Sequence, residues 1–560
     1  MCGIYGYIGQ LDAYNEVYNG LNMLQYRGYD SCGIAYYNKS KFDINKAVGV
    51  LNELKKPDIE THIAFGHTRW ATNGEVNLQN THPHVSFDKE FTIVHNGIIT
   101  NANIIKNELQ KNKIKFYSAT DTEVIANVLA CFKGNILDKL QSVYDICKGS
   151  FSLIIGCKNG DIYLLKRFSP LNILKSKDGI YISSDVSSLK EGELYSLEDG
   201  DIIRISNGEI TSLLGNEIKF SFHHNTIKSF KLGKYKHYML KEIYETPESI
   251  MNTYKYISTK DIRKIFKHIN KITLIGCGTA YNSCLIGEQL MKDNLHLDID
   301  SHLASNYTIS KKINRRHLHI IISQSGETAD CIKVAEQVKQ NSGKLLIITN
   351  EESSTITKYA DYILPTKAGK ELAVASTKTY CCQLFVFAYI CMILKNKNYS
   401  IDICSLKLEL ENFIEKINIK PLVKKLIDKD KLIMIGKDID YLTLIEASLK
   451  IREIDYVYTI PMYSGELKHG TLSLIDKDSI VLSLNTDDNF YRLDTAKNEI
   501  NSRGGEVIEI SKFFPKMNIE KCFRPILSII PFQLLSYYIA VERGRNPDMP
   551  RNLAKSVTVE

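Results

Sequence analysis

The most constraining feature of this sequence is a pattern that repeats in its second half. From about residue 260, short apolar runs alternate with loops of small residues and with amphipathic helical stretches. An alternation of strand, loop and helix favours a parallel, doubly wound sheet. The pattern therefore predicts two related α/β domains, at 261–400 and 420–550. The expected strands are 272–275, 318–323, 344–349 and 361–365 in the first domain, and 431–436, 479–484 and 506–511 in the second.

The first half of the chain has a different pattern. Between residues 1 and about 225, short β-branched runs at 92–94, 151–155 and 161–165 alternate with Gly, Asn and Asp turns. Such alternation is typical of antiparallel strands. Helical stretches at 101–112 and 122–132 interrupt the strands, so we predict an α+β domain over residues 2–225. The stretch 226–260 is predicted to be a linker with some helix.

Length and charge fit a globular chain of several domains. With 560 residues, the protein is too long for one hydrophobic core and needs about three or four packed units. The net charge of +7 is spread along the chain without a basic block. Such a balance suits anionic small molecules at least as well as nucleic acid, and we expect neither nucleic acid nor membrane as a partner.

Cysteine usage indicates a reducing compartment. The thirteen cysteines are scattered and no C-x-x-C pair occurs, which fits a thiol-rich cytosolic protein better than a disulfide scaffold. The N-terminus lacks the charged and then apolar pattern of a signal peptide. The most apolar run, Cys381–Leu394, is interrupted by Gln383 and is too short to span a bilayer. We therefore expect a cytoplasmic protein in which this run forms a buried helix.

The second residue is a cysteine, and its position has chemical consequences. Removal of Met1 would leave Cys2 with both a thiol and a free α-amine. An α-amine has a pKa of about 7.7–8.0, so it can accept the thiol proton and later donate it to a leaving group. Cys2 is thus a candidate nucleophile that carries its own base. The alternative is a buried structural cysteine at the start of a strand.

Several further residues of the first domain suit an amino-acid site. The pair Asn96–Gly97 offers a side-chain amide and a backbone N–H for an oxyanion hole, or else forms a hairpin turn. Arg69 and Asp121 suit the carboxylate and the ammonium of an amino acid, and each is otherwise a surface charge. His82 and His84 have no accompanying ligand cluster, so no metal site is predicted.

These motifs occur in an order that resembles a known family. The order is CGI at 2–4, YRGYDS at 26–31, GHTRWAT at 66–72, HPH at 82–84, HNG at 95–97 and TDTE at 120–123. It resembles the class II glutamine amidotransferases, which have the N-terminal nucleophile hydrolase fold. The resemblance implies that Cys2 attacks the side-chain amide of glutamine and that Asn96 and Gly97 form the oxyanion hole. It also implies that glutamine is held by Arg69, Thr72, His82 and Asp121.

Trp70 is the only tryptophan of the chain and lies within the GHTRWAT motif. The resemblance implies that it gates a channel through which ammonia leaves the glutamine site. The alternative is an ordinary core aromatic residue.

Three loops rich in Ser and Thr follow predicted strands of the first α/β domain. The loop 323–328, SQSGET, leads from a strand into a helix, and hydroxyls with backbone N–H groups at a helix N-terminus can bind phosphate. An ordinary β–α turn is the alternative. The loop 276–280, GCGTA, lacks the third glycine of a dinucleotide site, and VASTK at 374–378 opens the apolar helix. Together the loops resemble the sugar isomerase (SIS) domain, which binds phosphosugars.

The second α/β domain contains three charged residues on one predicted helix face. Glu446, Lys450 and Glu453 lie in a helical pattern over 442–454 and are spaced by four and three residues. The simplest interpretation is a surface ion pair. However, GELKHG follows at 465–470, and the chain ends in RNLAKSVTVE at 551–560.

From Cys2 to Glu560 the chain resembles the isomerising glutamine–fructose-6-phosphate aminotransferases. The resemblance implies that glutamine and fructose 6-phosphate give glutamate and glucosamine 6-phosphate, the first step of hexosamine synthesis, without cofactor, in a homodimer. Ammonia passes between the domains, and the tail 551–560 enters the sugar site. The implied sugar and phosphate ligands are Thr279, Ser323, Gln324, Ser325, Thr328, Val374 and Ser376.

The resemblance also implies the chemical roles in the sugar half. Glu453 moves a proton between C1 and C2, His469 assists ring opening, and Lys555 forms an imine with the ketose. The residue types suit these roles, because a carboxylate can abstract a proton beside an imine and a lysine with a lowered pKa can form one. Outside this family pattern, a lysine near a C-terminus is a solvated charge.

Two positions depart from the family pattern, and two other functions stay open. Ala280 stands where Ser commonly follows CGT, which removes a hydroxyl from the phosphate pocket, and Thr471 stands where Pro commonly follows KHG. The linker also looks short. One alternative is another amidotransferase, such as an amidophosphoribosyltransferase, which would need an acidic diphosphate-binding loop. The other is a phosphosugar-binding regulator with a silent amidotransferase domain, against which the intact Cys2, Glu453, His469 and Lys555 count.

Overall fold

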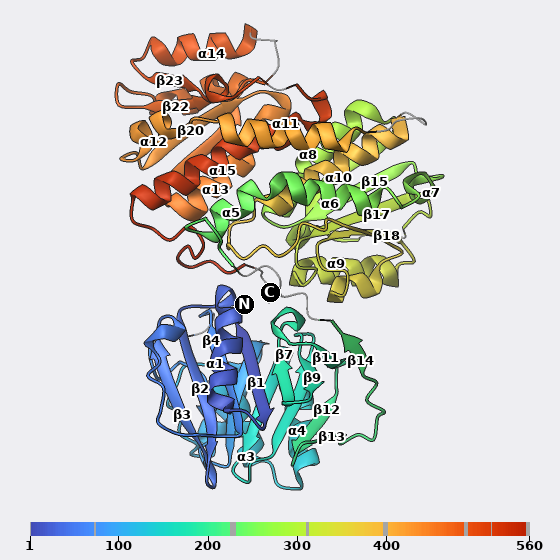
Figure 1. Cartoon of the computed structure of the whole chain (residues 1–560), viewed down its shortest axis with the longest axis vertical. Coiled ribbons are helices and arrows are strands. Elements are labelled where there is room, and N and C mark those ends of the chain that lie inside the picture. The colour runs from blue at the N-terminus through green and yellow to red at the C-terminus, as the bar shows by residue number, and fades with distance from the viewer. Residues whose placement is uncertain are drawn as a thin grey trace. The chain divides into compact units, whose positions relative to one another are not determined.

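The computed structural model describes residues 2–71, 74–224, 231–309, 313–395, 401–486, 491–516 and 518–555. Contacts divide the chain into two compact units (Figure 1). Unit 1 comprises residues 1–231 together with 554–560, and unit 2 comprises residues 232–553.

Unit 1 contains two antiparallel sheets. The eight-stranded sheet has the order β14-β11-β9-β10-β1-β4-β2-β3 and the six-stranded sheet the order β13-β12-β8-β7-β6-β5. The first sheet consists of β1 Gly3–Gly9, β2 Ser31–Asn38, β3 Lys41–Val48, β4 Ile63–Arg69, β9 Asn172–Ser176, β10 Gly179–Ser183, β11 Gly192–Ser196 and β14 Ser221–His223. The second consists of β5 His84–Val85, β6 Phe91–Ile99, β7 Gly149–Cys157, β8 Ile162–Arg167, β12 Ile202–Ser206 and β13 Glu209–Ser212.

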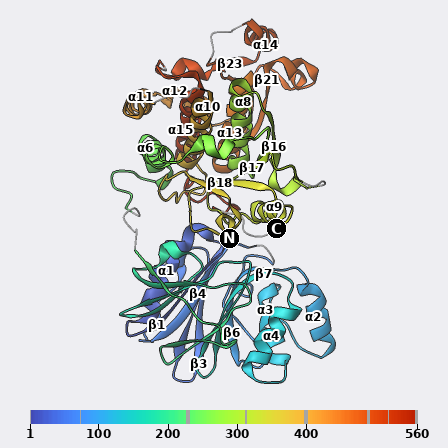
Figure 2. The same cartoon turned by 90° about the vertical axis from the view of Figure 1, so that its right-hand side faces the viewer.

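Helices cover the outer faces of both sheets, which gives four layers. Apolar residues of the two sheets, among them Ile4, Phe65, Val94 and Ile154, pack against each other in a buried inner core. Helix α1 (Ala13–Leu24) packs on the eight-stranded sheet. Helices α3 (Asp121–Cys131) and α4 (Ile136–Ile146) pack on the six-stranded sheet, with α2 (Ala102–Lys111) beside them (Figure 2). The predicted strands and the two predicted helices of this half are confirmed.

Unit 2 contains two parallel sheets, one of five strands and one of four, and the four strands of the second follow the same topology as the first four of the larger sheet. Their orders are β16-β15-β17-β18-β19 and β21-β20-β22-β23, so in each the second strand of the repeat lies at the edge beside the first. The first sheet consists of β15 Lys271–Gly276, β16 Asp298–Leu303, β17 His317–Ser323, β18 Lys344–Thr349 and β19 Tyr362–Pro365. The second consists of β20 Lys431–Gly436, β21 Tyr458–Tyr463, β22 Ile480–Ser483 and β23 Glu506–Glu509. The predicted repeat is confirmed, with one additional edge strand in each sheet.

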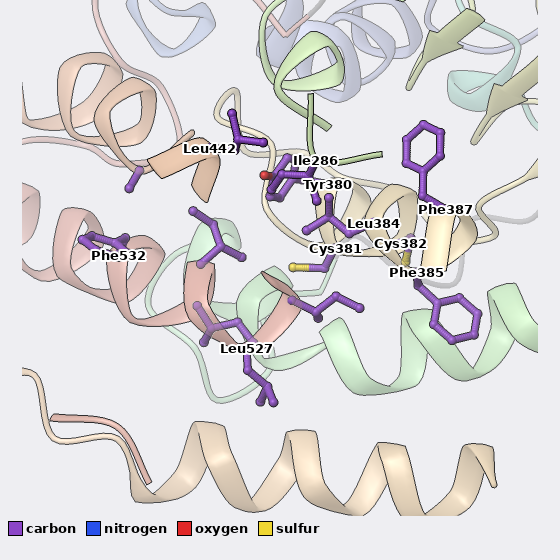
Figure 3. Packing of buried hydrophobic residues seen from close by; sticks show 14 of the residues in the cluster. Ile286, Tyr380, Cys381, Cys382, Leu384, Phe385, Phe387, Leu442, Leu527 and Phe532 are labelled. Carbon is purple, nitrogen blue, oxygen red and sulfur yellow. The ribbon is translucent and has the colours of Figure 1, made fainter. Parts of the chain in front are cut away.

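The helices of unit 2 share one large apolar core. Figure 3 shows its centre, where the long helix α10 (Lys378–Lys395) meets residues of α15 (Arg524–Glu542), among them Leu527 and Phe532. Both helices lie in stretches long and apolar enough to cross a membrane, but 78% and 83% of those stretches are buried inside the unit. The remaining helices are α5 Tyr238–Tyr244, α6 Thr246–Ile257, α7 Ile262–Phe266, α8 Thr279–Asn294, α9 Ala329–Gln340, α11 Ile403–Lys416, α12 Lys420–Leu426, α13 Asp438–Asp455 and α14 Tyr491–Asn501.

Most of the stretch predicted as a linker belongs to the core of unit 2. Helices α5 and α6 lie within 226–260, and their residues Met239, Ile243, Ile250 and Ile257 are completely buried. The apolar faces of these helices pack with the sheet and helix residues that follow them. The described part of the stretch from Leu232 onwards is therefore structured, and the contact boundary between the units falls between Lys231 and Leu232.

Candidate active sites

Strand pairing places Cys2 beside the residue that follows β4. Gly3 of β1 is the register partner of Thr68 in β4, so the antiparallel register brings Cys2 opposite Arg69 and within reach of the next residue, Trp70. The Trp70 N–H donates to the Cys2 Sγ at 3.3 Å, and the thiol lies 3.5 Å from the Trp70 carbonyl oxygen. Burial raises the pKa of the Cys2 thiol, while the Trp70 N–H and the charge of Arg69 oppose that shift.

The pair Asn96–Gly97 lies inside strand β6 and is not a hairpin turn. The Asn96 side-chain amide donates to the Cys2 carbonyl oxygen at 3.0 Å, which holds a side-chain donor beside the candidate nucleophile. Gly97 pairs with Phe151 of β7 and has a φ of +130°. A Cβ at this position would lie 2.0 Å from the Ser150 carbonyl oxygen. Only glycine fits here, and the turn alternative is wrong.

Arg69 and Asp121 are buried, so neither is a surface charge. Arg69 is 3% exposed and donates to the carbonyl oxygens of Gly74 and Glu75 at 3.2 and 3.4 Å. Asp121 begins helix α3, and its Oδ2 accepts the Ile99 N–H at 2.9 Å. This bond ties the start of the helix to the strand that carries Asn96. Thr72, predicted to bind glutamine, lies outside the described residues.

His82 belongs to a buried cluster of histidines. Its ring stacks on that of His67, with centroids 4.0 Å apart and an interplanar angle of 12°. The His82 Nδ1 accepts the His95 N–H at 3.4 Å, and its Nε2 lies 3.3 Å from the Thr122 Oγ1. The ring centroids of His84 and His82 lie 4.9 Å apart. Burial lowers the pKa of all four histidines, that of His67 to about 3, so they are neutral at physiological pH.

The predicted phosphate loop is a turn at the N-terminus of α9 that its own hydroxyls close. The Ser323 Oγ accepts the Gly326 N–H and lies near the Thr328 Oγ1, both at 3.1 Å. The Ser325 Oγ accepts the Glu327 N–H at 3.2 Å. Gln324 is anchored through its carbonyl oxygen, which accepts the Asn350 N–H at 3.1 Å. The structure thus brings all four predicted loop ligands to one end of a parallel strand.

A buried carboxylate that the sequence did not reveal organises the loop before α10. Glu371 is 4% exposed; its Oε2 accepts the Ser376 hydroxyl at 2.8 Å, and its Oε1 accepts the Thr377 N–H at 2.9 Å. Val374 is also buried and donates its N–H to the Asp548 carbonyl oxygen at 3.0 Å. The two predicted sugar contacts are therefore held in place by residues outside the predicted motif.

The three charged residues of α13 form a buried ionic network with helix α8. The Lys450 Nζ lies 2.8 Å from the Glu453 Oε2 and 3.3 Å from the Glu446 Oε1, and it donates to the Thr279 hydroxyl at 3.0 Å. Glu446 also accepts the Thr279 hydroxyl at 3.1 Å and the Asn282 side-chain amide at 2.7 Å. The network joins the two α/β repeats and brings the predicted base together with a predicted phosphate ligand.

This network is buried, so it is not the surface ion pair that the sequence alone suggested for these residues. The Lys450 and Glu446 side chains are completely buried, whereas Glu453 is 20% exposed. Burial alone would lower the pKa of Lys450, but the charges of Glu446 and Glu453 raise it above its ordinary value. Burial raises the pKa of Glu446, against the opposing effects of Lys450 and Asn282. Lys450 therefore carries a fixed positive charge beside two carboxylates.

Two predicted residues are not part of these clusters. His469 ends a 3₁₀ helix, Ser464–His469, and is exposed, and within the part of the chain that the structure describes no hydrogen bond or ion pair of its side chain is recorded. Lys555 is the last described residue and is partly exposed; it groups with unit 1, whereas Leu553 groups with unit 2. The roles predicted for both residues stay predictions.

Two sequence families match the regions that carry these sites. Residues 67–191 match the glutamine amidotransferase domain family, and residues 265–392 match the SIS domain family. The protein is thus a glutamine amidotransferase domain joined to sugar isomerase domains.

Relatives over the full length define the family more narrowly. Enzymes named glutamine–fructose-6-phosphate aminotransferase (isomerising) from Caldanaerobacter subterraneus and Bacillus subtilis are 35% and 34% identical, over 100% of both chains. The structure of the C-terminal domain of glucosamine–fructose-6-phosphate aminotransferase from Francisella tularensis aligns with a TM-score of 0.51 and 30% identity, over 57% of this chain and 100% of that one. The chain belongs to the family of isomerising glutamine–fructose-6-phosphate aminotransferases.

Proposed function

We propose that the chain transfers the amide nitrogen of glutamine to fructose 6-phosphate, giving glutamate and glucosamine 6-phosphate. Full-length relatives with this activity in their name support the proposal. The observation that carries it is the contact of Lys450 with both Glu453 and Thr279. An amidotransferase that served another acceptor would not need a carboxylate beside a phosphosugar loop.

The glutamine half works through a covalent intermediate on Cys2, within a fold of the N-terminal nucleophile hydrolase type. The α-amine exposed by removal of Met1 takes the thiol proton, and the sulfur attacks the amide carbon of glutamine. The Asn96 amide and the Gly97 N–H stabilise the oxyanion, and the protonated amine passes its proton to the leaving ammonia. Water then hydrolyses the thioester to glutamate. Arg69, Thr72, His82 and Asp121 hold the substrate.

The sugar half works through proton transfer between neighbouring carbons. The loops with Thr279, Ser323, Gln324, Ser325 and Thr328 bind the phosphate, and Val374 and Ser376 lie on the sugar. His469 assists opening of the ring, and Lys555 forms an imine at the C2 carbonyl. Ammonia replaces Lys555 at C2, and Glu453 then moves a proton from C1 to C2. The Lys450 ammonium binds the Glu453 carboxylate and is itself bound by Glu446.

Ammonia made at Cys2 reaches the sugar without release, and Trp70 gates its passage. The test is the variant Trp70→Ala, in which glutamate release is expected to continue while glucosamine 6-phosphate falls below one per glutamate. If Trp70→Ala still forms as much glucosamine 6-phosphate per glutamate as the wild type, Trp70 is not a gate. We also propose that the protein is cytoplasmic and uses no metal or cofactor. We propose further that it is a homodimer, and light scattering of the purified protein tests this oligomeric state.

The experiment that tests the whole function measures both products with and without fructose 6-phosphate. The wild-type protein should release glutamate and glucosamine 6-phosphate together, and intact mass should show a chain that begins at Cys2. Cys2→Ala should lose glutamine-dependent amination by at least about 10³-fold, yet use ammonia as nitrogen donor. The exposed Cys131 provides the matched control, Cys131→Ala. If neither the wild type nor Cys2→Ala forms amino sugar from ammonia, the proposal is wrong.

A further inference from the structure

Tyr456 lies between two arginines of the C-terminal segment at the end of helix α13. It caps the helix with φ 52° and ψ 37°, in the left-handed region that bulky residues rarely adopt. The guanidinium carbons of Arg545 and Arg551 lie 4.6 and 4.2 Å from the centroid of its ring. The Tyr456 hydroxyl oxygen accepts the Arg551 N–H at 2.8 Å. One aromatic side chain thus contacts the segment through both its ring and its hydroxyl.

The same end of α13 is bound by arginine side chains from the segment. Arg543 donates to the Asp455 carbonyl oxygen at 3.1 Å, and Arg545 donates to the same oxygen. Carbonyls in the last turn of a helix lack intrahelical partners and carry a partial negative charge, which guanidinium groups satisfy. Arg543 also donates to the carbonyl oxygens of Ile427 and Lys429, at 2.6 and 2.8 Å.

A second anchor lies between these arginines in the sequence. The Asp548 carboxylate accepts the N–H groups of Tyr238 and Met239 at 2.8 and 2.7 Å. The carbonyl oxygen of the same residue accepts the Val374 N–H at 3.0 Å. The segment 543–551 therefore connects the start of α5, the loop before α10 and the end of α13, all within unit 2.

The chain length on either side of Tyr456 makes this anchor relevant to the chemistry. Glu453 lies three residues before Tyr456 on the helix, and Lys555 lies four residues after Arg551. Four extended residues span at most about 14 Å. Holding Arg551 therefore limits how far Lys555 can lie from the anchored segment, whereas release of Arg551 would lengthen the reach of the tail.

We propose that Tyr456 is a positioning residue for imine formation: by holding Arg551 in unit 2, it limits the reach of the short tail that carries Lys555. The inference rests on the proposed function for the roles of Glu453 and Lys555. It adds a residue outside every motif that the sequence singled out.

Two substitutions separate the contributions of Tyr456. Tyr456→Asn removes the ring and the hydroxyl but keeps a residue type that tolerates left-handed backbone. Tyr456→Phe keeps the ring between the arginines and loses only the acceptor for the Arg551 N–H. Tyr458 is 77% exposed on edge strand β21, so Tyr458→Asn serves as the matched control two residues away.

The experiment traps the imine on the full-length protein. Each variant is incubated with fructose 6-phosphate and cyanoborohydride, which reduces an imine to a stable amine, and mass spectrometry measures the adduct on Lys555. Tyr456→Asn should form the adduct about 10- to 100-fold more slowly, Tyr456→Phe should be intermediate, and Tyr458→Asn should match the wild type. Binding of a hexitol 6-phosphate, which has no carbonyl, should be unchanged in every variant.

A second measurement needs no sugar and does not depend on the proposed function. Trypsin should cleave after Arg551 faster in Tyr456→Asn than in the wild type or in Tyr458→Asn. A wild-type trapping rate in Tyr456→Asn, or an equal loss of hexitol 6-phosphate binding, overturns the positioning role. If the wild type forms neither adduct nor amino sugar, the proposed function fails, and the trypsin result alone then decides whether Tyr456 holds the segment.

Discussion

The two candidate sites are held together by different parts of the polypeptide. In unit 1 the key contacts involve the backbone: the Trp70 N–H meets the Cys2 sulfur, and the Asn96 amide meets the Cys2 carbonyl oxygen. In unit 2 they join side chains, with Lys450 central and Glu453 among its partners. The geometry of a site built on paired strands depends on strand register, whereas the geometry of a side-chain network depends on the charges of its members. Substitutions should therefore damage the two sites in different ways.

We expect the largest effect when a substitution removes the central charge of unit 2. Lys450→Met leaves Glu446 buried without its cation, so the free energy of unfolding of unit 2 should fall by about 3–5 kcal/mol. Urea denaturation monitored on both units measures the change, and unit 1 should be unaffected.

A surface lysine of the same helix region supplies the control. Lys437 pairs with Asp438, and both side chains are exposed, so Lys437→Met should hardly change stability. The double variant Lys450→Met with Glu446→Leu should recover part of the loss, because no charge is then left unpaired. Equal stability of the wild type and Lys450→Met would show that the network is not the element that holds this site.

The next effect concerns the backbone of unit 1. Gly97→Ala should destabilise unit 1 by about 2–5 kcal/mol, because left-handed strain adds to a clash with a backbone carbonyl. Glutaminase activity should be lost as well. Gly208 is the natural comparison, because its φ is also positive but no atom of the described residues lies within 4 Å of the place that a Cβ would take. Gly208→Ala should cost only about 1–2 kcal/mol. Similar losses for both variants would mean that close approach at Gly97 is unimportant.

Acid should destabilise unit 1 more than unit 2. Burial holds the pKa of each clustered histidine below its value in the unfolded chain, so protons bind to the unfolded state first. Above about pH 6.5 these histidines do not lower the free energy of unfolding. Below that pH the free energy of unfolding falls, by up to about 1.4 kcal/mol per pH unit for each histidine. Unit 1 has four such residues in one cluster, His67, His82, His84 and His95, and unit 2 has a smaller pair, His317 and His319.

Calorimetry between pH 7 and pH 5 measures this difference. The unfolding transition of unit 1 should move to lower temperature by more than that of unit 2. A larger shift for unit 2 would contradict the assignment of the acid sensitivity to the histidine cluster.

We expect the smallest effect when a substitution adds one hydroxyl to the candidate site of unit 2. Ala280 lies next to Thr279 in the first turn of α8 and is partly buried. Ala280→Ser should lower the KM for fructose 6-phosphate by about 2- to 10-fold, since one hydrogen bond contributes about 0.5–1.5 kcal/mol. Thr471→Pro, at the other departure from the family pattern, should leave the KM unchanged. A higher KM in Ala280→Ser would show that the hydroxyl does not reach the phosphate.

Pattern alone located the central strands of the two parallel sheets and the edge strands β19 and β23, but not the edge strands β16 and β21 or several helices. Central parallel strands are buried on both faces, so 318–323 and 344–349 are continuous apolar runs. The edge strands β16 and β21 carry polar and exposed residues, which resemble loop sequence. Helix α1 was missed because Gly20 interrupts it; the structure shows that a Cβ there would lie 2.3 Å from the Tyr5 ring. Close packing against a distant strand, not local preference, explains that glycine.

The same limit applies to the residues of the sites. Spacing placed Glu446, Lys450 and Glu453 on one face, but it could not tell whether that face met water or another helix. Asn282 follows Thr279 by three residues, so helical spacing contained a signal for it. No pattern marks Glu371, because its partners are the N–H groups and hydroxyl of a loop that folds back on it.

The sequence by itself determined the local features of this protein: the order of its motifs, the strand–helix repeat of the second half and the spacing of charges on α13. These follow from periodicity and residue chemistry within a few turns of chain. Only the tertiary structure decided that the histidines and the Lys450 network are buried, that Asn96–Gly97 lies within a strand and that Tyr456 holds the C-terminal segment. The reason is physical: burial and pairing depend on contacts between residues tens to hundreds of positions apart, which local patterns do not encode.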